Sequence, residues 1–182
     1  QDVEPILPRF VGSHPLCGSE KTGVTHASAD LFVGAACAVT PTEQSDAEAV
    51  AKVNEFWGAL GGTFINLTAE AHDNIVARTS HLPHVVASAL VNAILGKSHA
   101  GESDFIGAGF ADTTRLASGS PAMWRDIALT NDEAIQKAIN DLQNELGKLK
   151  NALASKDAAA LENFFEEGKT SRDQWLKGDG KK

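Results

Sequence analysis

The sequence predicts a mainly helical protein in which a small α/β segment precedes an all-helical domain. The chain of 182 residues contains no Tyr and only 6% aromatic residues, whereas Ala, Leu and Glu are plentiful, and this composition favours helices over a β sandwich. Short apolar runs typical of strands occur before residue 68, and apolar residues recur at helical spacing after it. We therefore expect an α/β domain over residues 1–68 and a helical domain over residues 69–182.

Charge and composition exclude several classes of function. The formal net charge is -8, and the lysines gather towards the C-terminus without aromatic residues between them, so nucleic acid is not expected as a partner. No apolar run is long enough to cross a bilayer, and the N-terminus lacks the pattern of a signal peptide. Cys17 and Cys37 are too few for a disulfide framework. We expect a cytoplasmic protein that binds small molecules and other protein chains, without a membrane partner.

The first candidate site comes after the apolar pair Phe10–Val11, which we interpret as the end of a strand. The chain then opens into residues 12–21, GSHPLCGSEK, and reactive groups in α/β proteins are often placed at such a strand end. Pro15 biases His14 to an extended backbone and keeps its imidazole out of any helix. A purely structural turn remains the alternative.

The next elements are a strand, a helix and a second strand. Residues 35–40, AACAVT, predict a strand ended by Pro41, and Ser45 or Asp46 can cap the helix after it. Apolar residues of that helix recur at helical spacing: Val50, Val53, Phe56, Trp57 and Leu60. We interpret Trp57 as a core residue, and Phe64 to Leu67 as the next strand. This order is typical of the closing part of an α/β sheet whose earlier strands we expect outside this chain, so an edge would be unpaired.

From Glu70 to Ile94 the apolar residues keep a helical period for about seven turns. Pro83 lies inside this helix and removes a backbone donor, which predicts a kink. His81 and His84 flank it at i, i+3 and share a face with Arg78. A metal site would need a third ligand, and regular helical phase turns His72 away. We therefore expect a donor that faces a substrate, and no metal.

Residues 104–127, DFIGAGFADTTRLASGSPAMWRDI, combine a glycine-rich turn, an acid, an arginine and a tryptophan between helices. Arg115 offers a planar fork of donors that suits a carboxylate, and it can pair with Asp112 at i, i+3. A structural ion pair and a ligand site both remain open. Pro121 fits the first turn of a short helix over Met123 to Leu129.

The C-terminal part predicts two further helices. Thr130 and Glu133 form a capping-box pattern at the start of a long helix. Its apolar residues form a heptad seam: Ile135, Ile139, Leu142, Leu146, Leu149 and Leu153. Such a seam requires a partner helix. That partner is either the last helix, which carries Leu161, Phe164, Phe165 and Trp175, or a second subunit.

Three stretches in the same order, GSHPLCGSEKTGV, HDNIVARTSHLPHVVASAL and GFADTTRLASGSPAMWRDI, resemble the prephenate dehydrogenase family, which includes arogenate and cyclohexadienyl dehydrogenases. The resemblance covers nearly the whole chain. It implies a Rossmann-like NAD(P)-binding domain followed by a helical dimerisation domain. The glycine fingerprint is absent here, so we expect the end of the nucleotide-binding domain and the whole helical domain.

The resemblance also implies roles for individual residues. His14 corresponds to the catalytic histidine, and Arg115 to the arginine that grips the ring carboxylate of the substrate. Further positions resemble substrate contacts, namely Ser19, His84 and Trp124, or members of an ionic network around the arginine, namely Glu20 and Asp112. No cofactor-binding residue is assigned.

The implied function is oxidative decarboxylation of prephenate or arogenate in tyrosine biosynthesis, carried out by a homodimer. NAD or NADP would serve the full-length enzyme, whereas this chain alone is expected to bind no cofactor tightly and to be inactive. The alternative is a non-catalytic helical module for dimerisation or for regulation by bound tyrosine.

Overall fold

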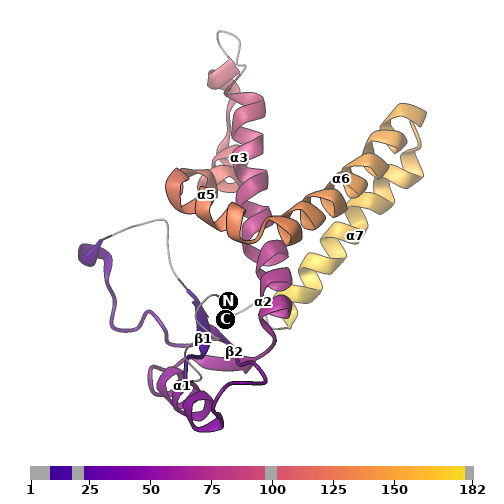
Figure 1. The fold of residues 1–182 in the computed structure, drawn as a ribbon. Coiled ribbons are helices and arrows are strands. Elements are labelled where there is room, and N and C mark those ends of the chain that lie inside the picture. The colour runs from indigo at the N-terminus through magenta and orange to yellow at the C-terminus, as the bar shows by residue number, and fades with distance from the viewer. Residues whose placement is uncertain (1–8, 18–22, 97–101, 179–182) are drawn as a thin grey trace. The chain divides into compact units, whose positions relative to one another are not determined.

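The computed structural model describes residues 9–17, 23–96 and 102–178, and it is mainly helical, as predicted. The chain divides into two compact units, residues 1–135 and residues 136–182. The first unit holds a small sheet and most of the helices, and the second holds the rest of one long helix and the final helix (Figure 1).

The sheet has three strands in the order β1 (Gly12–Leu16), β2 (Ala36–Thr40) and β3 (Thr63–Asn66). Strand β1 runs antiparallel to β2, and a 3-10 turn at Val24–His26 lies in their connection. Strand β2 runs parallel to β3 and is joined to it through helix α1 (Ala47–Ala59). The predicted strand, helix and strand are therefore confirmed.

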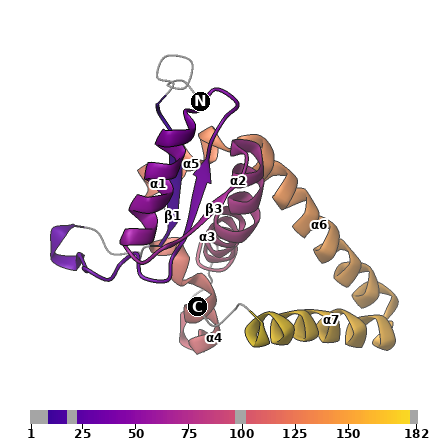
Figure 2. The ribbon, with the colours of Figure 1, turned by 90° about the horizontal axis from the view of Figure 1, so that it is seen from below.

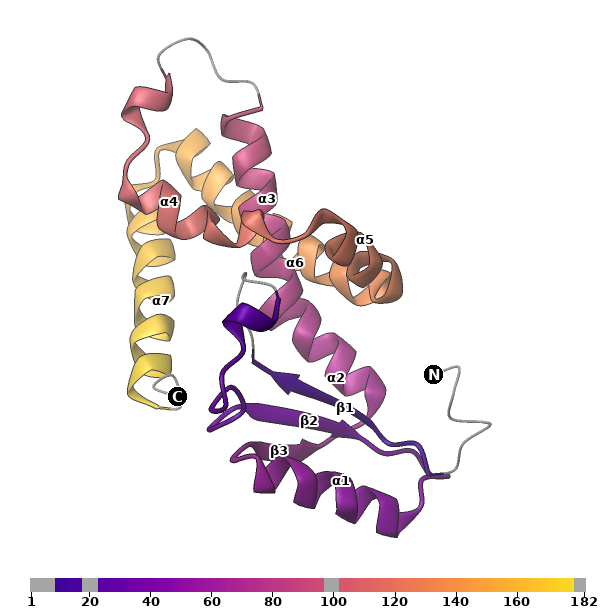
Figure 3. The ribbon, with the colours of Figure 1, turned by 90° about the vertical axis from the view of Figure 1, so that its left-hand side faces the viewer.

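Helix α1 covers one face of this sheet (Figure 3). Trp57 packs there against Val11, Cys37 and Val39, which confirms its interpretation as a core residue. Asp46 is the N-cap, since its Oδ1 accepts the amide of Glu48 at 2.8 Å. After the helix, Gly61 adopts φ +82°, a left-handed conformation that favours glycine.

His14 lies within strand β1, which corrects the prediction that it sits in a turn after the strand. The antiparallel pairing with β2 extends from Gly12 to Leu16, and His14 is opposite Ala38. Because side chains alternate along a strand, His14 points away from the face that carries Cys37 and Val39. Strand β1 is at the edge of the sheet, where the missing donor of Pro15 is tolerated.

The predicted long helix is interrupted. Helix α2 (Ala69–Val76), capped by Thr68, passes into a π-helical turn (Ala77–His81) and then into α3 (Leu82–Ile94). The sequence predicts the irregularity at Pro83, and it occurs in the turn before that residue. Pro83 has no amide to donate to the carbonyl of Thr79, so the regular hydrogen-bond pattern cannot pass through this turn.

The π-helical turn corrects the interpretation of His72. Regular helical phase places His72 and His81 on different faces, but a π turn holds more residues than an α turn and so rotates the helix beyond it. In the structure both histidines line the same cavity.

A 3-10 turn (Glu102–Phe105), helix α4 (Ala108–Thr114) and a second 3-10 turn (Arg115–Ser118) lead into α5 (Pro121–Thr130) and α6 (Asp132–Ser155). Pro121 is the first residue of α5, as predicted.

The predicted capping box at Thr130 is wrong. Thr130 ends α5, and its hydroxyl donates to the carbonyls of Asp126 and Ile127. Asn131, the residue between the helices, instead uses its side chain to reach two groups in the neighbouring α2 and π-helical turn.

In the second unit, α6 turns back at Lys156, a residue with φ 53°, and α7 (Ala158–Lys177) starts at the N-cap Asp157. The two helices diverge from this turn (Figure 2). Several large apolar side chains remain uncovered: Leu146 is 52% exposed, Leu153 58%, Phe165 63% and Trp175 60%.

Candidate functional site

His14 opens into a cavity of about 560 Å³ between strand β1, helix α2 and the junction of α5 with α6. We call it the histidine cavity. Its polar lining consists mainly of side chains from several segments: His14, Thr40, His72, Asp73, His81 and Asn131. Sheet alternation brings His14 to this side, and the π-helical turn brings His72 and His81 together on it.

Three of these residues form a hydrogen-bonded chain. Oδ1 of Asp73 lies 2.9 Å from Nδ1 of His72, and Nε2 of His72 lies 2.9 Å from Nδ1 of His14. The two imidazole rings meet edge to face, with an interplanar angle of 69°. Each ring is therefore held by a directed hydrogen bond.

Asn131 connects Asp73 to His81, which is not itself a member of this hydrogen-bonded chain. The side-chain amide of Asn131 donates to the backbone carbonyl of Asp73 at 2.9 Å and lies 3.3 Å from Nδ1 of His81. The last turn of α2 and the π-helical turn are thus held by the junction of α5 and α6.

Burial and neighbouring charge lower the pKa of His14 and of His81 and so favour their neutral forms. Partial burial lowers the pKa of His14, and nearby His72 lowers it further. The pKa of His81 is lowered by burial first and then by His14 and His72, while Asp73 acts in the opposite direction. A neutral imidazole can accept a proton near neutral pH, so His14 has the protonation state that a general base requires.

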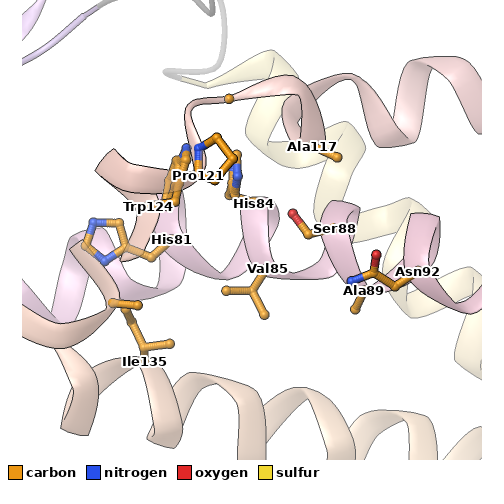
Figure 4. A pocket seen from close by; sticks show the side chains of 12 residues that line it. His81, His84, Val85, Ser88, Ala89, Asn92, Ala117, Pro121, Trp124 and Ile135 are labelled. Atoms are coloured by element: carbon orange, nitrogen blue, oxygen red, sulfur yellow. The ribbon is translucent and has the colours of Figure 1, made fainter. Parts of the chain in front are cut away.

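A second cavity of about 430 Å³ lies between α3 and α5 (Figure 4). We call it the tryptophan cavity, because Trp124 stacks on His84 with ring centroids 3.6 Å apart and an interplanar angle of 13°. Burial lowers the pKa of His84, which favours the uncharged ring in this stack. His81 meets Trp124 edge to face, and it lines both cavities.

The structure brings only some of the predicted residues together. His14 lines the histidine cavity, whereas His84 and Trp124 line the tryptophan cavity. Arg115 and Asp112 are exposed at the end of α4 and in the turn after it, and neither lines either cavity. Within one chain, neither cavity therefore joins Arg115 to His14. Ser19 and Glu20 lie outside the described residues.

Sequence reasoning misses four residues of these cavities. A regular helix would turn His72 away from His81, and the π-helical turn changes that phase. Asp73 carries no pattern of its own in the sequence. Asn131 lies inside the predicted capping pattern, which gives it no role of its own. Gly119 lies against the Trp124 and His84 stack, and only the packing around it reveals why no side chain fits there. A proline inside a helix that carries several histidines is the one available signal for a change of phase.

The N-terminus of helix α1 does not fit the pyrophosphate of a dinucleotide. In the only strand, helix and strand unit of the described residues, the N-terminus of α1 is capped by the carboxylate of Asp46 and followed by Glu48, where a pyrophosphate would need free amides and no acid. Over the same residues, no cluster of three or more His, Cys, Asp or Glu could hold a metal ion. No helix in the described ranges is both long and apolar enough to span a membrane.

Comparison with protein families decides the relationship. Residues 68–167 match the dimerization domain of prephenate dehydrogenase, and residues 1–66 match its nucleotide-binding domain. The chain belongs to the prephenate dehydrogenase family. Its resemblance to that family is thereby confirmed.

Curated members of the prephenate dehydrogenase family cover most of the chain. The prephenate dehydrogenase of Bacillus subtilis is 35% identical over 94% of this chain and 47% of its own length. The cyclohexadienyl dehydrogenase of Zymomonas mobilis is 36% identical over 90% of this chain and 57% of its own length. The chain spans about half the length of the curated relatives it matches.

Solved structures of this family share the fold. A crystal structure of prephenate dehydrogenase from A. aeolicus, in complex with hydroxyphenyl propionate and NAD+, matches with a TM-score of 0.90 and 37% identity, over 95% of this chain and 62% of that one. The arogenate dehydrogenase of Synechocystis matches with a TM-score of 0.84 and 28% identity, over 96% of this chain and 64% of that one.

Proposed function

We propose that this chain is the substrate-binding and dimerisation part of an enzyme that oxidatively decarboxylates prephenate or arogenate with NAD or NADP. The observation that carries the proposal is His14, a histidine with a lowered pKa at a polar cavity, hydrogen-bonded through Nδ1. Its other ring nitrogen is then left for a substrate. Membership of the family and the relatives with prephenate and arogenate dehydrogenase names support it.

His14 would act on the ring hydroxyl of the substrate. Its Nε2 takes the proton of the hydroxyl while hydride leaves the ring carbon that carries this hydroxyl. Loss of the ring carboxylate as carbon dioxide then makes the ring aromatic. The proton then returns to the phenolic oxygen, so the histidine ends neutral. A nicotinamide supplies the hydride acceptor in this family, and we assign no residue of this chain to it.

Arg115 would bind the ring carboxylate, because a guanidinium can hold a carboxylate through two parallel hydrogen bonds. Asp112 precedes it by three residues, and we assign Asp112 and Glu20 to the ionic network that orients it. Ser19, His84 and Trp124 complete the proposed substrate contacts.

A homodimer is part of this proposal. The dimerization domain of the family matches residues 68–167, and the exposed apolar residues of α6 and α7 are suited to pack against a second copy. NAD(P)-dependent turnover would require a dinucleotide-binding segment beyond the described residues, so we expect the 182-residue chain alone to be inactive.

The competing function is a non-catalytic module that dimerises or binds tyrosine as a regulator. The tryptophan cavity supports it, since a stacked aromatic pair with Ser88 and Asn92 nearby suits an aromatic amino acid. A module would bind tyrosine without any turnover of prephenate or arogenate in the full-length protein.

Steady-state kinetics of the full-length protein test the enzyme proposal. His14→Asn should lower kcat by about 10²- to 10⁴-fold with little change in KM, as expected for loss of a general base. Arg115→Gln should mainly raise KM, by about 10- to 100-fold, because a charged hydrogen bond contributes about 1.5–3 kcal/mol.

Two exposed residues give matched controls. His26→Asn and Arg125→Gln make the same two types of substitution at exposed positions outside both cavities, and they should leave kcat and KM unchanged. Unchanged kinetics in both test variants would rule out these roles, and a full-length protein without turnover of either substrate would favour the module.

A further inference from the structure

We propose that His72 and Asp73 are positioning residues for His14: they select the tautomer that leaves Nε2 of His14 free, and they share the charge when that nitrogen takes a proton. The inference rests on the proposed function for its catalytic meaning. Its structural part, the tautomer, stands on the hydrogen-bonded chain alone.

The tautomer of His72 is set by Asp73. A carboxylate is only an acceptor, so the 2.9 Å contact between Oδ1 of Asp73 and Nδ1 of His72 requires a proton on that nitrogen. A neutral imidazole carries one proton, so Nε2 of His72 is then an acceptor. His72 is well enclosed, with 17% of its side chain exposed, whereas 40% of the Asp73 side chain is exposed.

The tautomer of His14 is set in turn by His72. Nε2 of His72, now an acceptor, lies 2.9 Å from Nδ1 of His14, so this nitrogen must carry the proton. The lone pair of His14 is therefore on Nε2. This is the nitrogen that the proposed function requires as the base.

The same chain accommodates the charge formed during the reaction. When Nε2 of His14 takes the hydroxyl proton, the Nδ1 proton of His14 can move along the 2.9 Å bond to Nε2 of His72. The positive charge then lies beside the carboxylate of Asp73, which stabilises it. When the phenolic oxygen takes its proton back, both protons return to their original positions and no net charge remains.

His81 is held outside this chain by Asn131. The amide of Asn131 donates to Nδ1 of His81, so the proton of neutral His81 is on Nε2. The titratable groups that line the histidine cavity are His14 from β1, His72 and Asp73 from α2, and His81 from the π-helical turn. A titration assigned to His14 must therefore be separated from that of His72 and His81.

Nitrogen-15 NMR of the histidine rings in the 182-residue chain tests the tautomer without any turnover. We expect neutral His14 to be protonated on Nδ1 in the unchanged chain. His72→Phe should remove that preference, because no acceptor remains. His72→Gln should preserve it, because the amide oxygen can accept the same proton. Asp73→Asn should shift His14 towards protonation on Nε2, because an amide can donate to Nδ1 of His72.

Glu70→Gln is the matched control, since it removes one negative charge from the same helix outside the histidine cavity. It should leave the His14 tautomer unchanged. The structural part of the proposal is overturned if neutral His14 carries its proton on Nε2 in the unchanged chain, or if His72→Phe and His72→Gln have the same effect.

Kinetics of the full-length protein test the catalytic part. We expect kcat to fall in the order unchanged protein, His72→Gln, His72→Phe, with the last lower by about 10- to 100-fold and KM nearly constant, a smaller loss than the roughly 10²- to 10⁴-fold expected when the general base itself is removed. In Asp73→Asn the acidic limb of the kcat/KM profile should move to lower pH, because a negative charge that stabilises the protonated pair is lost. Equal kcat in both His72 variants, or an acidic limb that stays at the same pH in Asp73→Asn, would overturn the catalytic part of the proposal.

Failure of this inference differs from failure of the proposed function. If the full-length protein turns over neither prephenate nor arogenate, the proposed function fails, while the NMR result still decides the tautomer. If the unchanged protein is active and the His72 and Asp73 variants match it in both rate and tautomer, the function stands and the positioning roles fail.

Discussion

Gly119 is the residue whose lack of a side chain matters most for the tryptophan cavity. A Cβ at this position would lie 2.6 Å from Nε1 of Trp124 and 2.9 Å from Cε1 of His84. Both atoms belong to the stacked pair, so neither ring can yield without opening the stack. Glycine is needed here for space, since its φ is -66° and any residue could adopt that backbone.

Gly119→Ala should therefore destabilise the protein by about 1–3 kcal/mol, the usual cost of forcing extra volume into a packed site. Urea unfolding monitored by tryptophan fluorescence measures the change. Gly109→Ala is the control, because nothing lies within 4 Å of the added Cβ and the position is helical, so it should be neutral or stabilising. Equal effects of the two substitutions would contradict the steric explanation.

Single residues differ in how far the sequence predicts them. Trp57 repeats with its neighbours at helical spacing, and it is buried as that period requires. His14 and Trp124 are assigned by resemblance, and each lies at a cavity. The resemblance could not show that one chain places these two residues in different cavities, because that depends on contacts between distant segments.

At the scale of elements, Asn131 links two parts of the first unit that are 58 residues apart in sequence. Its side chain donates to the carbonyl of Asp73 and reaches Nδ1 of His81, so it joins the start of α6 to α2 and to the π-helical turn. The acceptors are partly buried, and they would lose these donors together.

Asn131→Ala should lower the free energy of unfolding by about 1–3 kcal/mol, as expected when partly buried acceptors lose their partner. It should also raise hydrogen exchange of the amides in α2 and the π-helical turn. Asn140→Ala, an exposed asparagine on α6, serves as control and should change both by little. A similar loss in both variants would show that Asn131 contributes no specific link.

The order and type of the elements can be predicted from local patterns, since apolar periods and caps depend on neighbours along the chain. Helix α1 begins after Asp46, one of the two predicted caps, and α5 begins at Pro121, the residue predicted for its first turn. The π-helical turn is not predicted, because its effect is a rotation of the helix that only packing partners reveal. That rotation decides which histidines share a cavity.

At the scale of the whole molecule, the apolar residues of α6 and α7 remain to be covered. Leu146, Leu153, Phe165 and Trp175 are each more exposed than buried within the second unit. The heptad seam predicts a partner helix, and the last helix of the same chain leaves Leu146 and Leu153 of this seam exposed. A second copy of the chain is the partner that the proposed homodimer provides.

The 182-residue chain should therefore be a dimer at micromolar concentration in light scattering. The double variant Leu146→Glu and Leu153→Glu should be a monomer, because it places charges on the apolar surface. Gln143→Glu adds a charge at an exposed polar position of the same helix and should remain a dimer. A monomeric unchanged chain, or a dimeric double variant, would exclude this surface as the interface.

By itself, the sequence determined the mainly helical class, the strand, helix and strand at the start, the core role of Trp57 and the resemblance to a family, because each depends on residues close together in the chain or on motifs in order. Only the tertiary structure decided that His14, His72 and Asp73 form one hydrogen-bonded chain and that His84 stacks on Trp124 in a separate cavity. The reason is geometric: strand alternation and one π-helical turn set the directions of side chains up to 58 residues apart, and no local pattern encodes their meeting.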